Sequence, residues 1–333
     1  MKNIFFLVIF VLICYSCNSK PQEIIKLFGF AQGTTYSISY YEDNNINYQK
    51  QIDSLLKEFD KSVSIYIPNS LISRINRNEQ DVVIDNIFRE IFIRSREVSE
   101  KTDGAFDITV APLVNNWGFG HTDKTGVDSA GIDSLKEFVD YKLVTIESGR
   151  IVKQDPRVML DFNAIAQGGS VELIAGYLEG KGIDNYLVEI GGEVKAKGRK
   201  VNGDAWRIGI DKPIDDPDAK NRELQEIVRL TDKSLATSGN YRKYYIENGV
   251  KYSHTIDPET GFPVRHSLLS VTVVCDNCML ADAWATAFMV MGSEKSITMA
   301  EDIEGIEAYF IYSGKNGEPE IYCTEGFKDM IEE

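Results

Sequence analysis

Positive charge and histidine are scarce in this sequence. Its 333 residues include 36 Lys and Arg against 51 Asp and Glu, which gives a formal net charge of −15, and only 3 His. A surface this acidic repels phosphate backbones, which argues against a nucleic-acid partner. It also argues against a basic patch that would hold the protein on anionic lipid. The hydrophobic fraction of 43% is ample for one large core or for two lobes.

The sequence also lacks an apolar run long enough to cross a bilayer as a helix. Its N-terminal run, Ile4 to Cys14, is shorter than the roughly 18 residues required. A charged start and a small-residue end indicate a secretory signal peptide over residues 1–16. Cys17 resembles the cysteine that bacterial lipoproteins acylate after cleavage, which would leave 17–22 as a lipid-anchored tether. Signal cleavage nearby without a lipid is the alternative.

Both alternatives place the mature protein outside the cytosol. We expect it in the bacterial cell envelope and, with the lipid on Cys17, as a membrane lipoprotein of the inner membrane facing the periplasm. That lipid would be its only attachment to the membrane.

Cysteine is too sparse for a disulfide framework. Three of the five Cys, namely Cys275, Cys278 and Cys323, lie beyond the leader, and an odd number does not suit such a framework. No second CxxC exists beyond the leader to complete a zinc site with Cys275 and Cys278. This pair is interpreted as two small residues around a turn, although a disulfide in an oxidising compartment is also compatible with the spacing.

Strand and helix patterns are mixed along the chain. Residues 24–40 alternate and predict two strands separated near Gly33, whereas apolar residues recur at helical spacing from Ile87 to Val98. Asn248-Gly249 is a strong hairpin signal. Because helices and hairpins occur without a regular βαβ rhythm, we predict an α+β fold with mixed or antiparallel sheets and packed helices.

Two strand-to-helix junctions are expected in the second half of the chain. A strand from Val158 leads through a tight loop into a helix that contains Val171 and Leu178. A second strand, over residues 268–274, leads into a helix that begins near Ala281.

Four segments are more specialised than folding requires. Each combines small, polar and acidic residues in an order that a plain strand or helix does not need. They are Thr102–Leu113 with Trp117–Gly120, Leu160–Gly169, Ala236–Arg242 with Ser253–Gly261, and Ala281–Thr286.

Asp282 and Thr286 are four residues apart on a predicted helix, so their oxygens share one face. A carboxylate and a hydroxyl suit a hard cation such as Mg²⁺, particularly one that is also bound to phosphate. Alternatively, Asp282 caps the helix N-terminus and Thr286 is an ordinary surface residue. Taken alone, the two residues favour the cap.

Other candidates have similar alternatives. The glycines at 168 and 169 would let backbone N–H groups approach a phosphate, or would serve an ordinary tight turn. His254 could move a proton or pair with phosphate, although an isolated histidine near a hairpin is more often a surface residue. Aromatic residues could stack on a ring, but they belong to the core by default. The aromatic candidates are Tyr66, Phe106 and Trp117.

In this order the four segments resemble the FAD:protein FMN transferases, the thiamine-biosynthesis lipoprotein ApbE family. The resemblance extends from about Gly33-Thr34-Thr35-Tyr36 to Gly292, which is most of the chain beyond the leader. It includes Ser64-Ile65-Tyr66, the GAFD sequence at 104–107 and SHTIDPETG at 253–261. It implies an ApbE-like, two-lobed single catalytic unit over residues 23–333.

The resemblance implies an enzyme that transfers FMN from FAD to a Ser or Thr hydroxyl of an acceptor protein and releases AMP. The acceptors implied are respiratory membrane flavoprotein subunits. Mg²⁺ would be held by the Asp282 carboxylate, the Thr286 hydroxyl and the Ala166 backbone carbonyl. His254 and Asp257 are the catalytic candidates, for proton handling or phosphate positioning. Residues expected to bind FAD are Tyr66, Ala105, Phe106, Asp107, Thr109, Gln167, Gly168, Ser238 and Gly239.

Three positions depart from the family pattern. Gln167 stands where Lys is usual, Gly169 where an aromatic is usual, and Glu172 where Asp is usual. The missing lysine removes a phosphate contact, and the glycine is expected to open space near the loop. The metal ligands are intact.

Two other functions share these features. An FAD pyrophosphatase would give FMN and AMP by transfer to water, and it needs the same metal and FAD. A non-catalytic flavin-binding lipoprotein would need no metal, so Asp282 and Thr286 argue against it.

The leader generates the first prediction. Cys17→Ser is expected to release the protein from the membrane fraction, because it removes the thiol that would carry the lipid. Fractionation of cells that express the wild type and the variant measures this. Equal retention of both in the membrane would contradict a lipid anchor at Cys17.

Overall fold

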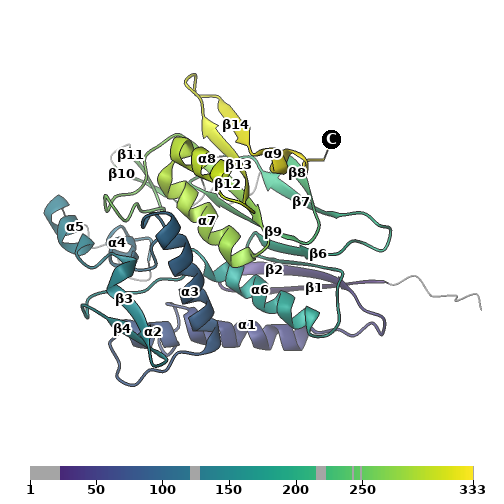
Figure 1. Ribbon diagram of the computed structural model, residues 1–333, viewed down its shortest axis with the longest axis horizontal. Coiled ribbons are helices and arrows are strands. Elements are labelled where there is room, and N and C mark those ends of the chain that lie inside the picture. Colours follow the sequence, from purple (N-terminus) through teal and green to yellow (C-terminus); the bar gives the residue numbers. More distant parts are fainter. Residues whose placement is uncertain (1–22, 121–127, 215–222, 242–243, 248–249, 333) are drawn as a thin grey trace, which may run out of the picture.

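An eight-stranded antiparallel sheet forms the centre of the molecule, in the order β1-β2-β5-β6-β9-β12-β13-β14 (Figure 1). Its strands span Ile24–Ala31 (β1), Thr34–Tyr41 (β2), Tyr186–Ile190 (β5), Glu193–Lys197 (β6), Lys233–Gly239 (β9), Leu268–Cys275 (β12), Glu307–Ser313 (β13) and Pro319–Cys323 (β14). Three two-stranded pairs complete the strands: Val144–Glu147 (β3) with Arg150–Lys153 (β4), Trp206–Asp211 (β7) with Leu224–Leu230 (β8), and Tyr244–Glu247 (β10) with Val250–Ser253 (β11).

The computed structural model describes residues 23–332 except 121–127, 215–222, 242–243 and 248–249. The predicted signal peptide, Cys17 and the tether 17–22 therefore lie outside the described residues. Within the described part of the chain, no helix has the length and apolar character needed to cross a membrane.

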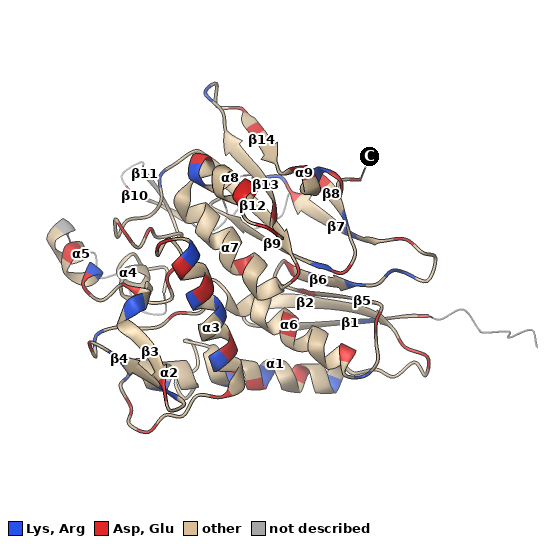
Figure 2. Ribbon diagram, viewed as in Figure 1, with Lys and Arg blue, Asp and Glu red and all other residues tan. Residues whose placement is uncertain are grey.

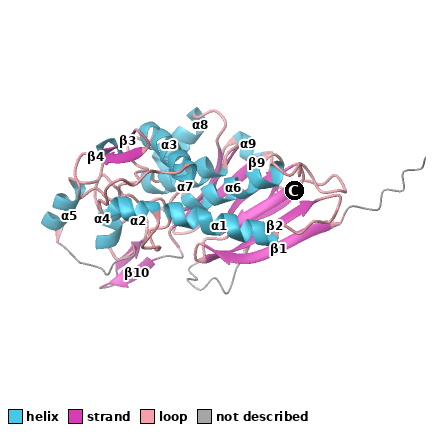
Figure 3. Cartoon of the chain, turned by 90° about the horizontal axis from the view of Figure 1, so that it is seen from below, coloured by secondary structure: helices cyan, strands magenta, loops and turns pink. Residues whose placement is uncertain are grey.

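The helices lie mainly on one face of the sheet (Figures 1 and 3). α1 and α6 bury Leu56 and Ile174 against Ile38 and Val188 of the strands β2 and β5. α7 buries Phe288 in the largest core, together with strand residues from β12 and β13. The helices span Gln49–Val63 (α1), Leu71–Asn76 (α2), Asn86–Lys101 (α3), Ala111–Asn116 (α4), Ser129–Lys136 (α5), Ala166–Glu179 (α6), Cys278–Met291 (α7), Ser293–Asp302 (α8) and Glu325–Lys328 (α9), with a 3₁₀ turn at Tyr141–Leu143.

The opposite face of the sheet is covered over part of its width. Trp206 and Ile210 of β7, Val228 of β8 and Phe327 of α9 pack against inward side chains of β6, β9, β12 and β13. This smaller core does not cover the outer face of β1 and β2 at the end nearest the turn that joins them.

Charged residues follow the solvent-facing sides of the helices (Figure 2). Along α3, Arg94 pairs with Glu90 and Glu97, one turn away on either side. Such exposed pairs contribute about 0.3–0.5 kcal/mol each, so the fold depends on the apolar faces described above rather than on them.

The sequence predicts most of these elements correctly. The strand pair at 24–40, the helices around Ile87 and Val171, and the α+β class are all confirmed. The hairpin over 244–252 is confirmed by the pairing of β10 with β11, although its turn residues 248 and 249 lie outside the described residues.

Three predictions are wrong in detail. The segment from Val158 is not a strand, since it contributes only an isolated bridge between Met159 and Val110. α7 begins at Cys278 rather than near Ala281, because Asn277 accepts a hydrogen bond from the Leu280 N–H and caps the helix. Gly169 does not open space, because the ring of Phe59 and the Ile91 side chain fill the position that a Cβ would face.

Gly168 lets α6 and α7 cross in close contact. A Cβ at this position would lie 2.3 Å from the Cys278 carbonyl oxygen and 2.9 Å from Asp282 Cβ. Neither atom can move without shifting the backbone of α7. Glycine is therefore a packing requirement here.

Gly168→Ala is expected to lower the free energy of unfolding by about 1–3 kcal/mol, the usual cost of overpacking. Gly176→Ala, in the same helix, is the matched control, because nothing lies within 4 Å of the added methyl group. It should raise the stability by roughly 0.5–1 kcal/mol, since Ala is the better helix former. Urea unfolding of the three proteins measures both effects. Equal shifts would argue against the close crossing.

Candidate functional site

One cavity of about 680 Å³ gathers residues from all four specialised segments. Its walls come from the β1–β2 turn, the end of α1, the turn after β5, the strands β7 and β9, and α7. A volume of this size suits a cofactor-sized ligand. The predicted site residues that line it are Tyr66, Ala105, Phe106, Asp107, Ala166, Gln167, Ser238, Gly239, His254, Asp282 and Thr286.

α7 presents a narrow polar stripe to this cavity. Most of its side chains are buried, but Asp282, Thr286 and Val290 are partly exposed and all three line the cavity. Their spacing of four residues places them on one face of the helix. The side chains expected to share a ligand therefore do face one space.

Asp282 is not a helix cap, because α7 begins four residues earlier and is capped by Asn277. One oxygen of its carboxylate, Oδ2, accepts a hydrogen bond of 3.0 Å from the Gly168 N–H. Within the described part of the chain, the other oxygen accepts no hydrogen bond. Loss of water around the group raises the pKa of Asp282 to about 7.

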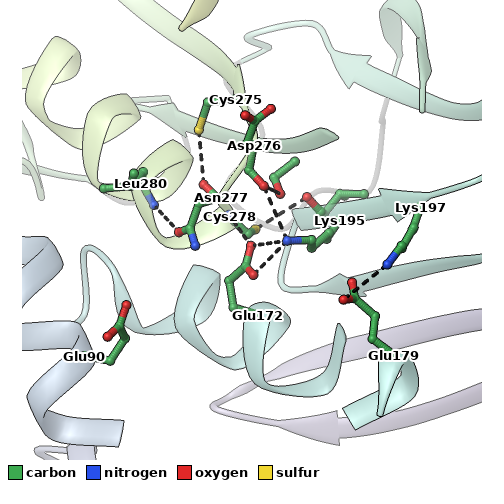
Figure 4. A network of polar contacts seen from close by, with 12 residues as sticks. Glu90, Glu172, Glu179, Lys195, Lys197, Cys275, Asp276, Asn277, Cys278 and Leu280 are labelled. Atoms are coloured by element: carbon green, nitrogen blue, oxygen red, sulfur yellow. Dashed lines mark hydrogen bonds and ion pairs between the residues drawn. The ribbon is translucent and has the colours of Figure 1, made fainter. Parts of the chain in front are cut away.

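The first turn of α7 is held in place by the carboxylate of Glu172, which forms a salt bridge with Lys195 (Figure 4). Lys195 Nζ donates to both oxygens of Glu172, at 2.9 and 2.8 Å, and Cys278 N–H donates to the same carboxylate at 2.6 Å. Glu172 thus connects α6, β6 and the N-terminus of α7, where a negative charge is favourable. Lys195 could not be recognised from the sequence, because its partner is 23 residues away on another element.

The cavity wall is acidic. Among the described lining residues there is no Lys or Arg, and His254 is the only histidine. The carboxylates on the wall are Asp60, Asp107, Asp161, Glu189, Glu193, Asp211 and Asp282. An anionic ligand in such a cavity requires a bound cation or protons to balance the charge.

The donor set fits a hard cation that is shared with a ligand. The described residues contain no cluster of three or more His, Cys, Asp and Glu side chains that could hold a metal alone. Asp282 offers an oxygen without a hydrogen bond, Thr286 offers a hydroxyl one turn away, and Ala166 lies on the same wall. Such oxygen donors suit Mg²⁺ whose remaining positions are filled by water or phosphate.

Asp107 lines the cavity and is held in place by Thr109. Thr109 is fully buried and does not line the cavity; its N–H and hydroxyl donate to Asp107 Oδ1 at 2.7 and 2.6 Å. Tyr141 N–H donates to Oδ2 at 2.8 Å. Burial nevertheless raises the pKa of Asp107 to about 6. Thr109 therefore positions Asp107 rather than contacting a ligand.

Tyr66 lies at the cavity wall with 62% of its surface exposed. Burial of its hydroxyl, together with the charge of Asp161, raises its pKa, and a hydrogen bond with Asn163 acts in the opposite direction. An aromatic ring this exposed beside a cavity is available to stack on a planar ligand.

His254 lies on the cavity wall beside a set of stacked aromatic rings. Its ring makes an edge contact with Phe119, which stacks on Tyr245 at 5.3 Å. Trp117 Nε1 donates to the Gly261 carbonyl at 2.8 Å and so joins two of the specialised segments.

Asp257 and Gly168 have supporting positions rather than places on the wall. Asp257 Oδ1 accepts the Glu259 N–H at 2.9 Å and closes the turn that follows His254. Gly168 lies at the crossing of α6 and α7, where its N–H reaches Asp282.

Some lining residues that the sequence did not identify come from the turn between β1 and β2 and from the end of α1. Gln32, Thr34, Thr35 and Asp60 all line the cavity. The Gly33-Thr34-Thr35-Tyr36 motif was a usable signal for Thr34 and Thr35. No local pattern marks Asp60, whose pKa is raised by burial.

Comparison with known proteins shows the family of the chain. A family model described as the ApbE family matches residues 32–310. The FAD:protein FMN transferase of Vibrio cholerae is 36% identical, with 99% of each chain covered, and that of Haemophilus influenzae is 34% identical, with 90% of this chain and 89% of the relative covered.

Solved structures agree as well. The flavin transferase ApbE from Vibrio cholerae superposes with a TM-score of 0.83 at 36% identity, covering 93% of this chain and all of that one. The apo form of the Pseudomonas stutzeri flavinyl transferase ApbE gives a TM-score of 0.82 at 32% identity, with coverage of 93% and 97%. A match over most of the chain, in sequence and in fold, assigns this protein to the ApbE family of FAD:protein FMN transferases.

Proposed function

We propose that this flavin transferase depends on Mg²⁺ and links FMN to a Ser or Thr hydroxyl of its acceptor protein. The hydroxyl oxygen forms a bond to the phosphorus of the FMN half of FAD, and the bond between that phosphorus and the bridging oxygen breaks. The hydroxyl proton leaves to a base, and AMP departs with the bridging oxygen. The acidic cavity wall is the observation that carries the metal requirement.

A pyrophosphate cannot enter this wall uncompensated. The described lining of the cavity contains seven carboxylates and no Lys or Arg. Asp282, Thr286 and the Ala166 carbonyl would hold the cation between the face of α7 and the start of α6. When bound, Mg²⁺ would neutralise the pyrophosphate and stabilise charge on the departing oxygen.

His254 is the residue best placed to take the proton. It lies on the same wall as Asp282 and Thr286, and imidazole is the side-chain group best suited to proton transfer near neutral pH. Asp257 closes the turn that follows His254 and would act as a positioning residue. The neighbouring aromatic rings limit the orientations that the imidazole can adopt.

FAD would occupy the remaining wall. Tyr66 presents the exposed ring on which the flavin or the adenine can stack, and Asp107 presents a carboxylate held in place by Thr109. Gln167 lies beside the metal ligands and would face the phosphates. The other contacts would come from Ala105, Phe106, Ser238 and Gly239.

The setting of the reaction is part of the proposal. A signal peptide over 1–16 and a lipid on Cys17 would hold the enzyme at the inner membrane, facing the periplasm. The acceptors that fit this location are flavoprotein subunits of respiratory membrane complexes.

The metal site generates a direct test. Asp282→Ala should lower the rate of FMN transfer by more than the ~10–100-fold that is typical for loss of a residue that only supports a metal ligand, because it removes the only charged metal ligand. Thr286→Ala should be milder, since water can replace a hydroxyl, and excess Mg²⁺ should partly restore it. The rate of FMN transfer is measured for the wild type and both variants by in-gel flavin fluorescence of the acceptor over a range of Mg²⁺ concentrations.

Circular dichroism is the control that the variants remain folded. A wild-type rate and an unshifted Mg²⁺ dependence in Asp282→Ala would refute the metal site. Release of free FMN without labelled acceptor in the wild type would instead identify a pyrophosphatase.

Gln167 generates a second test. Gln167→Lys should tighten FAD binding, because it adds a positive charge to an acidic wall beside the phosphates. The effect should be largest at low salt, where charges are least screened, and without Mg²⁺. Titration of FAD fluorescence measures the dissociation constant. An affinity that does not change with ionic strength would show that residue 167 does not face the phosphates.

A further inference from the structure

Two phenylalanines of the edge strand β1 are exposed to solvent. Phe28 is 65% exposed and Phe30 is 72% exposed. Leu27, which packs in the core on the helix side of the sheet, is buried. Alternation along the strand places Phe28 and Phe30 together on the face opposite the helices. Single exposed apolar residues are common, but two neighbouring aromatic rings on one face of a strand form a small exposed hydrophobic patch.

The second apolar layer does not reach these rings. Ile24 and Tyr41, at the far end of the same two strands, pack against the core under β7 and β8. Phe28 and Phe30 lie opposite Ser37 and Thr35 of β2, which are small side chains that leave the rings uncovered. The open surface therefore occupies the end of β1 nearest the β1–β2 turn.

This surface is continuous with the cavity. Thr35, the register partner of Phe30, lines the cavity, as do Gln32 and Thr34 of the adjoining turn. Glu189, which pairs with Ser37 on the next strand, lines it too. A peptide segment of another protein that lies against the two rings would therefore extend toward the cavity in which transfer is proposed.

β1 also has the properties of a strand that can accept another strand. It is the outermost strand of the sheet at this end, and within the described residues it pairs only with β2. Edge strands are usually protected by charges or proline. Beyond Lys26, the rest of the hairpin, residues 27–41, contains neither, although 26% of the whole chain is charged.

Gly29 allows the ring of Tyr36 to pack directly against the backbone of β1. A Cβ at Gly29 would lie 2.4 Å from the ring of Tyr36, which crosses over β1 on the helix side and is fixed by contacts with Asp53 and Gln49. The ring supports β1 from behind, so the outer face is presented by a rigid strand.

We propose that the acceptor protein docks here, as an extended segment that pairs with β1 over Leu27–Ala31. Apolar side chains of that segment lie against Phe28 and Phe30, and its Ser or Thr hydroxyl enters the cavity beside Thr35. Backbone pairing gives affinity, and alternate side chains give selectivity, as in other strand-addition complexes. This inference rests on the proposed transfer of FMN to a protein hydroxyl.

The test is the double variant Phe28→Ser/Phe30→Ser. The probe is the unmodified soluble domain of a respiratory subunit that carries covalent FMN in its native form. kcat/KM for this acceptor should fall by about 10-fold or more, mostly through KM, because each lost aromatic contact at an interface costs on the order of tenfold in affinity. The dissociation constant for FAD should stay within about twofold, since the rings lie outside the cavity wall.

Two further variants control for apolarity and for folding. Ile321→Ser changes an exposed residue, 45% accessible, on the opposite edge strand β14, and should leave kcat/KM unchanged. Phe28→Leu/Phe30→Leu keeps the surface apolar and should retain most of the activity. Circular dichroism confirms the fold of each protein.

Several outcomes would overturn the docking surface. An unchanged KM for the acceptor in the double variant would do so directly. Unchanged transfer combined with lost binding to phosphatidylcholine vesicles would assign the rings to a lipid surface, and unchanged transfer with a lost dimer in native mass spectrometry would assign them to a second copy. If the wild type labels no acceptor, the proposed function fails rather than the docking surface.

Discussion

The crossing of α6 over α7 at Gly168 is the constraint on which the site depends. Because no side chain separates the two helices there, the Gly168 N–H reaches the Asp282 carboxylate directly. The same crossing sets the distance between Ala166, the first residue of α6, and the stripe of α7 that carries Thr286. Glu172 and Lys195 then hold the first turn of α7 from the other side. The candidate metal ligands are thus positioned by helix packing, which is stiffer than a loop.

The electrostatic design of the cavity follows from the same packing. Loss of water around two of its carboxylates raises the pKa of Asp107 to about 6 and that of Asp282 to about 7. A cavity of this kind resists anions until a cation enters with them. Substrate binding and metal binding are therefore expected to be coupled, each raising the affinity for the other.

The sequence predicts which residues gather at the cavity better than it predicts the boundaries of the elements. Periodicity identifies α3 and the β1–β2 hairpin, and motif order identifies Asp282, Thr286 and His254 before any coordinates are considered. It fails where long-range packing decides the outcome. The sequence around Val158 predicts a strand, but the segment is a buried loop in the structure. Gly169 was expected to open space near the loop, but the ring of Phe59 fills that space. Lys195 and Asp60 have no local signal, because only the folded chain brings them to Glu172 and to the cavity.

The two cysteines behind Asp282 have a chemical consequence. Burial raises the pKa of Cys275 to about 11 and the pKa of Cys278 well above its ordinary value, with the Glu172 charge adding to the second effect. At neutral pH almost no thiolate forms, and the thiolate is the form that reacts with oxidants and disulfides. Both thiols are free in the structure. Burial therefore disfavours the reactive thiolate form of this CxxC pair at the start of α7.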